Sequence, residues 1–574
     1  MQNKRQFVLQ AFLLTGVSLL LRSVGVCAQI YIAARVGAEA VGIFSLIGSV
    51  SGFAVTLALS GIQLGVTRMV AAGLGQDSHS AMPNLSEKSI HQTMTCAVLH
   101  ALFFGILSGA LLFFLATPIG SWVLHDLRTT APLRIMALTI PLIPLSACFS
   151  GYFVAVRRVY KSAILQVGEE LLRVTLTLLF LHYAVRRGIG ATLLSLAVSG
   201  AIADILSGVA LLILYTADIR RHFPSVSAYE KSHERFLLSL RRNFPIGKTL
   251  RRLLSITMPV AVASYARSGL VTLEHTLIPV GLRLFGLTQS QALSSYGALH
   301  SMALPVVLFP SALLSSFAGL LIPEVTEAQV RKEKRTLHTI LCRVFSLSLL
   351  FSIGVAGILL SNSFLFGEVL YHSTEVGINI RLLAPLIPIM YLDSAVDAIL
   401  KGQGQQLYCM KVNILDALVS VILVWILIPR IGLAGYVASI YTTEILNAAL
   451  SIVRLLTINE FRLPVISWIV KPIFSIIAAT SLTNLSLQFF PAVTTLPPVI
   501  TLVYTIFLSG CLYLFFLTLL RTIRQQEIHW FLSFFQKGTD NPRGIQTGQK
   551  SSAPAHRHCR ERKKELSFPT NESS

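Results

Sequence analysis

The sequence predicts an all-α membrane protein with about 14 transmembrane helices. Of its 574 residues, 53% are hydrophobic and only 13% are charged, and the mean hydropathy is +0.69. A soluble protein of this length carries about twice that fraction of charged residues. Apolar windows of about 20 residues, long enough to cross a bilayer, recur along most of the chain. We therefore assign the net charge of +21 to loops on one side of a membrane rather than to a nucleic-acid-binding surface.

The apolar windows give six spans in the first half of the chain, six in the second half and two more after them. The first six are 8–33, 41–66, 92–116, 132–156, 162–184 and 191–215. The others are 253–278, 296–322, 337–360, 381–400, 408–428, 433–455, 465–489 and 498–519. The first window follows Lys4 and Arg5, as a signal peptide would, but Arg22 interrupts it and no convincing cleavage site follows. We expect a retained first helix.

A repeated pattern divides the chain into two homologous halves. The tetrapeptide PLIP at 141–144 recurs at 385–388, 244 residues later. The dipeptide Arg22-Ser23 recurs as Arg267-Ser268 at nearly the same offset. Six helices per repeat is an even number, so both lobes enter the membrane from the same side and are related by a pseudo-two-fold axis along its normal. The predicted organisation is a first six-helix lobe (1–217), a basic cytoplasmic linker (218–252), a second six-helix lobe (253–458), helices 13 and 14 (459–520), and an interfacial segment with a disordered basic tail (521–574).

The distribution of lysine and arginine predicts that both termini are cytoplasmic. With the N-terminus inside, roughly 35 of the 47 basic residues fall inside and about 8 outside, as the positive-inside rule expects. The linker 218–252 is the most basic loop. The polar, basic tail is predicted to be a disordered arm held to anionic lipid.

Arginines in the first helix of each lobe are the main candidates for substrate contacts. Arg22 and Arg267 lie near the middle of their spans, where a charged side chain costs roughly 2.5–3.5 kcal/mol unless it faces a cavity or a partner. Two guanidinium groups that converge on a central cleft suit a doubly negative ligand such as a pyrophosphate. Glu274 follows Arg267 by seven residues and so lies on nearly the same helix face. The alternative, in which each arginine pairs with a carboxylate and only holds helices together, stays open.

Two further groups of ionisable residues lie inside predicted spans. Glu169 and Arg173 form an i,i+4 pair that either contributes to substrate binding or is a self-satisfied ion pair. Asp393 and Asp397 share a helix face and are candidates for ion coupling, although like charges this close equally leave one carboxyl protonated. Additional intramembrane candidates are Glu170, Asp204, Asp416 and Glu444.

We expect no enzymatic activity, cofactor or metal. The sequence has no Walker lysine loop, G-x-S-x-G elbow or zinc-binding helix motif. Its seven cysteines form no C-x-x-C pair, and Gly402-Gln403-Gly404 is better explained as a turn at a helix end than as a nucleotide loop.

Several short strings resemble a known family. In the second half they are YGAL at 296–299, MALP at 302–305, FPSA at 309–312, IPE at 322–324, LLAPLIP at 382–388 and LKGQGQ at 400–405. In the first half they are Arg22 with Gly25, the segment 37–42, GYF at 151–153, and QV at 166–167 with Glu169 and Arg173. Over about residues 5–520 the chain resembles the stage V sporulation protein B family. That family is in the polysaccharide-transport branch of the superfamily that includes multidrug and toxic compound extrusion (MATE) transporters.

The resemblance implies a V-shaped, two-lobed flippase that passes undecaprenyl-pyrophosphate saccharides across the cytoplasmic membrane. Arg22 matches one cavity arginine of the related lipid II flippases. Where those proteins carry two others, this chain has Ala28-Gln29 and Pro305-Val306. The resemblance therefore implies a pyrophosphate-lipid cargo without specifying lipid II.

The predicted function is the flipping of a lipid-linked cell-wall, spore-cortex or polysaccharide precursor by alternating access. The expected partners are this substrate, anionic lipids and cell-wall synthesis enzymes, but not nucleic acid. One alternative is a cation-coupled multidrug exporter of the same fold, against which the two arginines count. Another is a non-transporting scaffold for cell-wall synthesis.

Overall fold

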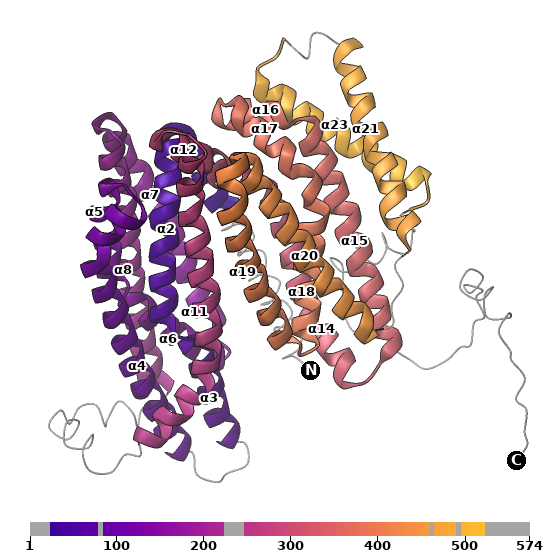
Figure 1. The fold of residues 1–574 in the computed structure, drawn as a ribbon. Helices are drawn as coiled ribbons and strands as arrows, with labels where there is room; N and C mark the ends of the chain where they lie inside the picture. The colour runs from indigo at the N-terminus through magenta and orange to yellow at the C-terminus, as the bar shows by residue number, and fades with distance from the viewer. Residues whose placement is uncertain (1–22, 78–83, 223–245, 460–463, 490–494, 523–574) are drawn as a thin grey trace, which may run out of the picture. The chain divides into compact units, whose positions relative to one another are not determined.

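The computed structural model describes residues 23–77, 84–222, 246–459, 464–489 and 495–522. Every regular element in these ranges is a helix, so the predicted all-α class is confirmed for the described part of the chain (Figure 1). Arg22, most of the linker 218–252 and nearly all of the segment 521–574 lie outside the described ranges.

The helices follow one another with short connections. The first half contains a helix at Ser23–Val36, then α2 Ala38–Leu59, α3 Ile62–Asp77, α4 Asn84–Pro118, η1 Ile119–Val123, η2 Leu127–Thr129, α5 Thr130–Thr139, α6 Leu142–Ala155, α7 Val159–Ala184, η3 Val185–Arg187 and α8 Ile189–His222. The second half contains α11 Ile246–Leu284, α12 Gln289–Tyr296, η4 Gly297–Ala303, α13 Leu304–Leu308, α14 Ser311–Val330, α15 Lys334–Ser361, α16 Ser363–Tyr371, α17 Thr374–Leu383, η5 Ala384–Leu386, α18 Ile387–Gly402, α19 Gln406–Ile431 and α20 Leu433–Asn459. The last elements are η6 Ile466–Val470, α21 Lys471–Phe489 and α23 Pro498–Leu519.

Ten helical stretches in the described residues are long and apolar enough to cross a membrane, which makes this a multi-pass membrane protein. They include ten of the fourteen predicted spans. Two other predicted spans, 162–184 and 253–278, are the continuous helices α7 and α11, in which charged and polar residues lower the hydropathy. The total of fourteen spans stays a prediction.

The predicted span 296–322 is interrupted rather than continuous. Here α12, the π-helix η4, α13 and α14 follow one another between Gln289 and Val330. Pro305 and Pro310 lie within this stretch, and a proline has no backbone N–H to continue an α-helical ladder. The long apolar window therefore predicted the membrane-length segment but not its breaks.

The PLIP repeat has the same local structure in both halves. Pro141 lies between the short helix α5 and the longer helix α6. Pro385 lies in η5, between the short helix α17 and the longer helix α18. The two matching breaks agree with the proposed repeat, while the symmetry between the halves stays a prediction.

Backbone contact between α2 and the α12–η4 segment joins the first half of the chain to the second. A Cβ atom on Gly42 would lie 2.3 Å from the Leu293 carbonyl oxygen, and one on Gly297 would lie 2.0 Å from the Ala38 carbonyl oxygen. One turn further along, the hydroxyls of Ser45 and Ser301 are 2.6 Å apart. Only glycine allows this close an approach of the two helices.

Candidate functional site

An ionic cluster in the first half surrounds Arg173 of α7. Its Nη2 atom lies 2.7 Å from Glu169 Oε1 on the same helix and 2.9 Å from Asp204 Oδ1 on α8. Its Nε atom lies 3.9 Å from Glu170 Oε2. The other oxygen of Glu169 accepts a hydrogen bond of 2.6 Å from Ser207 of α8.

This arrangement favours the ion-pair interpretation of Arg173 and Glu169 over direct phosphate binding. The guanidinium is shared among three carboxylates, so an incoming anion would have to displace them and meet their excess negative charge. The cluster ties α7 to α8, which pack along their length. A Cβ atom at Gly25 would lie 3.3 Å from Glu170 Oε1, so the first helix also passes close to this cluster.

Arg267 has a different environment from Arg173. It lies in the middle of α11 and its side chain is exposed. In the part of the chain that the structure describes, it forms no ion pair within 4 Å, and it interacts electrostatically with Asp416 of α19. An exposed guanidinium in the middle of a predicted span, without a carboxylate within ion-pair distance in the described residues, is a candidate for contact with an anionic ligand.

Four carboxylates interact with one another and form the second-half cluster, and one of them, Asp416, also interacts with Arg267. Asp416 interacts with Glu274 of α11, and Glu444 of α20 interacts with both Asp416 and Asp393 of α18. Glu274 also interacts with the Ser420 hydroxyl, one turn along α19 from Asp416. The Oδ1 atoms of Asp393 and Asp416 are buried without a hydrogen-bond partner. Helices α11, α18, α19 and α20 thus contribute carboxylates to one region of the protein.

Asp393 and Asp397 have different surroundings even though they share a helix face. Asp397 Oδ2 lies 2.5 Å from Lys401 Nζ, one turn further along α18. Asp393 instead joins the second-half cluster through Asp416 and Glu444. Of the two carboxylates predicted for ion coupling, Asp393 is the one that lacks a basic partner within ion-pair distance in the described structure.

A buried charge network at the end of α8 was not predicted from the sequence. The fully buried Asp218 carboxylate lies 2.7 Å from Arg158 Nη1 and 2.5 Å from Lys161 Nζ, and it accepts a hydrogen bond of 3.1 Å from the Tyr152 hydroxyl. Arg158 and Lys161, at the start of α7, entered the sequence prediction only as positive charge on the cytoplasmic side. Their pairing with Asp218, about 60 residues away, follows no local pattern in the sequence.

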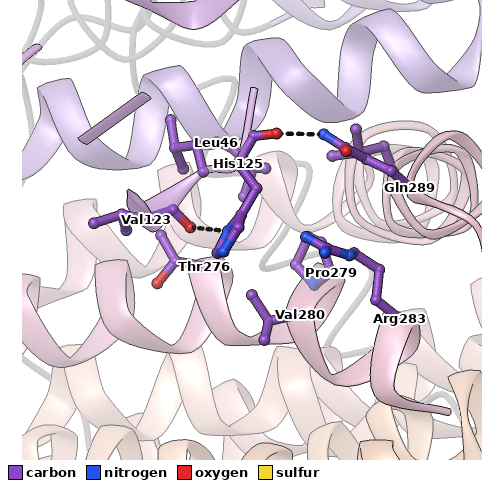
Figure 2. A pocket seen from close by; sticks show the side chains of 10 residues that line it. Leu46, Val123, His125, Thr276, Pro279, Val280, Arg283 and Gln289 are labelled. Atoms are coloured by element: carbon purple, nitrogen blue, oxygen red, sulfur yellow. Dashed lines mark hydrogen bonds between the residues drawn. The ribbon is translucent and has the colours of Figure 1, made fainter. Parts of the chain in front are cut away.

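A second polar network joins the two halves near the start of α2. Glu39 Oε1 accepts a hydrogen bond of 3.0 Å from Arg128, and Glu39 Oε2 accepts one of 2.5 Å from Ser290 of α12. Gln289 donates to the His125 carbonyl oxygen at 2.6 Å (Figure 2). The predicted topology places the residues of this network on the outer side of the membrane.

A small cavity adjoins this network. Figure 2 shows His125, Gln289 and Arg283 around it, with Leu46 and Val280 on its apolar walls. Its volume of about 10 Å³ is close to the minimum for one water molecule. This cavity is therefore too small for a saccharide, and the charged clusters described above are the better candidates for the site.

Comparison with known proteins identifies related sequences along most of the chain. A family model described as polysaccharide biosynthesis protein matches residues 8–329. Stage V sporulation protein B of Bacillus subtilis (strain 168) is 25% identical over 457 residues, which cover 77% of this chain and 82% of that protein. Sporulation protein YkvU of the same strain is 22% identical over 314 residues, which cover 54% of this chain and 67% of that protein. The family resemblance predicted from the sequence strings is confirmed.

Solved structures share the fold. The lipid II flippase MurJ in an inward closed conformation matches with a TM-score of 0.61 and 13% identity, over 89% of this chain and 98% of that one. An inward-facing multidrug resistance MATE family transporter of the MOP superfamily matches with a TM-score of 0.59 and 11% identity, over 78% of this chain and 98% of that one. At such low identities the likeness concerns the fold alone.

Proposed function

Because the chain belongs to the family of polysaccharide biosynthesis proteins, we propose that it is a flippase for an undecaprenyl-pyrophosphate-linked saccharide in the cytoplasmic membrane. The saccharide headgroup passes between the two halves while the polyprenyl tail stays in lipid, and alternating access exposes the site to one side at a time. The headgroup is a cell-wall, spore-cortex or polysaccharide precursor. The termini and the linker 218–252 are cytoplasmic in this proposal.

The observation that carries the proposal is the environment of Arg267. Its exposed guanidinium, without an ion-pair partner within 4 Å in the described structure, is suited to bidentate contact with phosphate oxygens. Arg173 is less suited because three carboxylates already surround it. We place Arg267 on the pyrophosphate, together with Arg22 of the first helix.

The second-half cluster supplies candidates for coupling. Glu274 lies two turns along α11 from Arg267, and Asp393 reaches the same cluster from α18. We propose that Glu274 orients the bound headgroup and that Asp393 takes part in ion coupling, with Asp397 restrained by Lys401. Membrane-buried carboxylates without close basic partners are common in such roles.

Depletion of the protein tests the cargo. We expect an undecaprenyl-linked intermediate to accumulate on the cytoplasmic leaflet, where mass spectrometry of extracted lipids identifies its saccharide. If no undecaprenyl-linked species accumulates, the flippase proposal is wrong.

Arginine variants test the site in the same depleted cells. Arg267→Ala and Arg267→Lys are expected to lose rescue at normal membrane abundance, with the lysine variant failing because an ammonium group lacks the planar fork. The matched control is Arg430, an exposed arginine at the end of α19, whose lysine and alanine variants are expected to rescue fully. Full rescue by both Arg267 variants would remove this residue from the site.

A second candidate function is cation-coupled export of a cationic drug on the same fold. The observation that favours it is the second-half cluster, whose four carboxylates outnumber its single arginine. Loss of this protein would then sensitise cells to lipophilic cations without changing undecaprenyl-linked lipids. If the protein is instead a scaffold for cell-wall synthesis, every Arg267 variant that reaches the membrane is expected to rescue the depleted cells.

A further inference from the structure

Two histidines and two tyrosines form a compact cluster inside the second half. His275 of α11 and His300 of η4 have ring centroids 4.4 Å apart. His275 Nδ1 lies 3.2 Å from the Tyr296 hydroxyl, and His300 Nδ1 lies 3.2 Å from the Tyr436 hydroxyl of α20. The rings of Tyr296 and His300 are stacked at 5.1 Å with an interplanar angle of 7°. Four elements, α11, α12, η4 and α20, thus meet at one imidazole–phenol cluster.

The four residues of the cluster lie within predicted membrane spans. Tyr296 is fully buried and Tyr436 is 2% exposed, while both histidines are partly buried. An ionisable group at such a position is costly unless it has a partner or a function. Each imidazole here has a phenol that both donates and accepts hydrogen bonds, so the cluster tolerates either protonation state at its nitrogen atoms.

The spacing of the two imidazoles limits the cluster to one extra proton. Two imidazolium ions at 4.4 Å would repel strongly, so protonation of one ring disfavours protonation of the other. Glu274, the neighbour of His275 in sequence, interacts electrostatically with both Tyr296 and Tyr436. The cluster is therefore able to hold one extra proton, on one of its two imidazoles, beside a carboxyl group.

Other charged groups approach the cluster from several sides. Asp416 of α19 interacts with Glu274, the residue before His275, and Glu444 of α20 interacts with Asp416. The Tyr371 hydroxyl of α16 donates to the Met302 carbonyl of η4. Groups on the neighbouring helices have partners of their own. Arg381 of α17 lies over the Phe364 ring, Glu39 of α2 binds Arg128 and Ser290, and Tyr391 of α18 donates to the Val307 carbonyl. Glu375 lies in the first turn of α17, where a negative charge is favourable.

The π-helix that carries His300 also forms the contact with the first half. Ser301, the next residue, lies 2.6 Å from the Ser45 hydroxyl of α2, and its carbonyl oxygen accepts a hydrogen bond of 3.4 Å from Gln29. Gly297, one turn earlier, packs on the α2 backbone. π-helical turns are frequent at functional sites. A change in charge at His300 therefore acts on a segment that contacts the first half directly.

We propose that His275, His300, Tyr296 and Tyr436 form a proton-binding site that couples protonation of the second half to the contact between η4 and α2. Proton binding at the imidazoles changes the hydrogen bonds of His300 and with them the stability of the η4–α2 contact. This inference goes beyond the flippase proposal, because it requires no particular cargo. It also predicts that protons modulate transport.

The test measures the distance between the two halves without any cargo. Spin labels are attached at Arg187→Cys, in the turn before α8, and Arg430→Cys, at the end of α19, in the full-length, otherwise cysteine-free protein. Pulsed electron–electron double resonance in nanodiscs then records the distance distribution between pH 4 and 8.5, a range that includes and extends below the ordinary titration of histidine. We expect two distances between the labels, one for each conformation. Because the conformations are coupled to one proton, the ratio of their populations is expected to change by up to about tenfold per pH unit.

Variants distinguish the cluster from other titrating groups. His300→Gln and His275→Gln are expected to abolish the pH response, and Tyr436→Phe, which keeps the ring and its packing, is expected to shift its midpoint. His182→Gln removes an exposed histidine of α7 and is expected to respond like the parent protein. A distance distribution that does not change with pH in the parent protein overturns the inference, as does an unchanged response in both His300→Gln and Tyr436→Phe. Either result would leave the cargo proposal intact, because that is tested by lipid accumulation.

Discussion

Gly42 of α2 and Gly297 of η4 lie in direct backbone contact. A Cβ atom built on Gly297 would lie 2.9 Å from the Gly42 nitrogen as well as 2.0 Å from the Ala38 carbonyl oxygen. This contact brings the first and second halves of the chain together at the segment that also carries His300. It gives the sequence string YGAL, which is part of the family resemblance, a physical reason to contain glycine.

Gly297→Ala is therefore expected to separate α2 from η4. Backbone atoms cannot yield as a flexible side chain does, so we expect a loss of roughly 1–3 kcal/mol in stability, measured by thermal unfolding in detergent. The control is Gly48→Ala in α2, the helix that Gly297 contacts, because a methyl group added at Gly48 meets no atom within 4 Å. Equal melting temperatures for the two variants would contradict the close packing.

Asp218 is expected to be essential for the stability of the first half. Asp218→Asn removes the charge that Arg158 and Lys161 share and leaves two cations close together. Breaking a buried pair costs about 3–5 kcal/mol, and partial exposure of the two basic side chains places this loss at the lower end. The matched control is Glu327→Gln, which breaks an exposed pair with Arg331 and is expected to change stability by about 1 kcal/mol or less.

Glu274→Gln is expected to impair transport more than folding. The amide keeps the size and polarity of the side chain near Ser420, but it removes the charge that faces Asp416, Tyr296 and Tyr436. Rescue of depleted cells is measured beside membrane abundance. Glu368→Gln on the exposed surface of α16 serves as the control and is expected to rescue normally. Normal rescue by Glu274→Gln at normal abundance would show that its charge is only structural.

The sequence predicted the helices well because membrane length and hydropathy are local properties. Charged residues lowered the hydropathy of α7 and α11, yet both windows were still recognisable. The breaks around η4 were missed because Pro305 and Pro310 interrupt a window whose apolar character is unbroken. A hydropathy pattern reports burial in lipid and not the continuity of the hydrogen-bond ladder.

The site was only partly predictable, because its groups meet through tertiary packing. The i,i+4 spacing revealed Glu169 and Arg173, but it gave no information on Asp204, which completes the cluster from α8. Similarly, Asp393 and Asp397 share a helix face, but only the structure separates them by pairing Asp397 with Lys401. His275 and His300 lie 25 residues apart without a common motif, so their contact was not predictable from the sequence.

Cysteine labelling tests the predicted topology. We expect cysteines at Ser232 in the linker and at Ser551 in the tail to resist a membrane-impermeant maleimide in intact cells, because the lysine and arginine bias places both inside. A cysteine at Arg187, in the exposed turn between α7 and α8, is predicted to face outward and is the positive control. Labelling of the linker or tail cysteine from outside would reverse the assigned orientation.

Arg22 provides the sharpest test of the pyrophosphate proposal. It lies outside the described residues, so its role rests on its mid-span position in the sequence and on its correspondence with Arg267. A purely structural arginine would tolerate lysine if its partner needed only one positive charge, whereas a pyrophosphate clamp needs the planar fork. We therefore expect Arg22→Lys to lose most of its function while still inserting into the membrane, and Arg22→Ala to lose more.

The decisive measurement combines Arg22 with Arg267. If both guanidinium groups contact the same pyrophosphate, the double alanine variant should lose no more rescue than the worse single variant, because residues that act as a unit are not additive. Arg22→Ala with Arg430→Ala is the control pair, expected to behave like Arg22→Ala alone. Full rescue by Arg22→Lys and Arg22→Ala at normal abundance would exclude Arg22 from the site. It would also favour the drug-exporter alternative, since a site for a cationic drug has no need of a second intramembrane guanidinium.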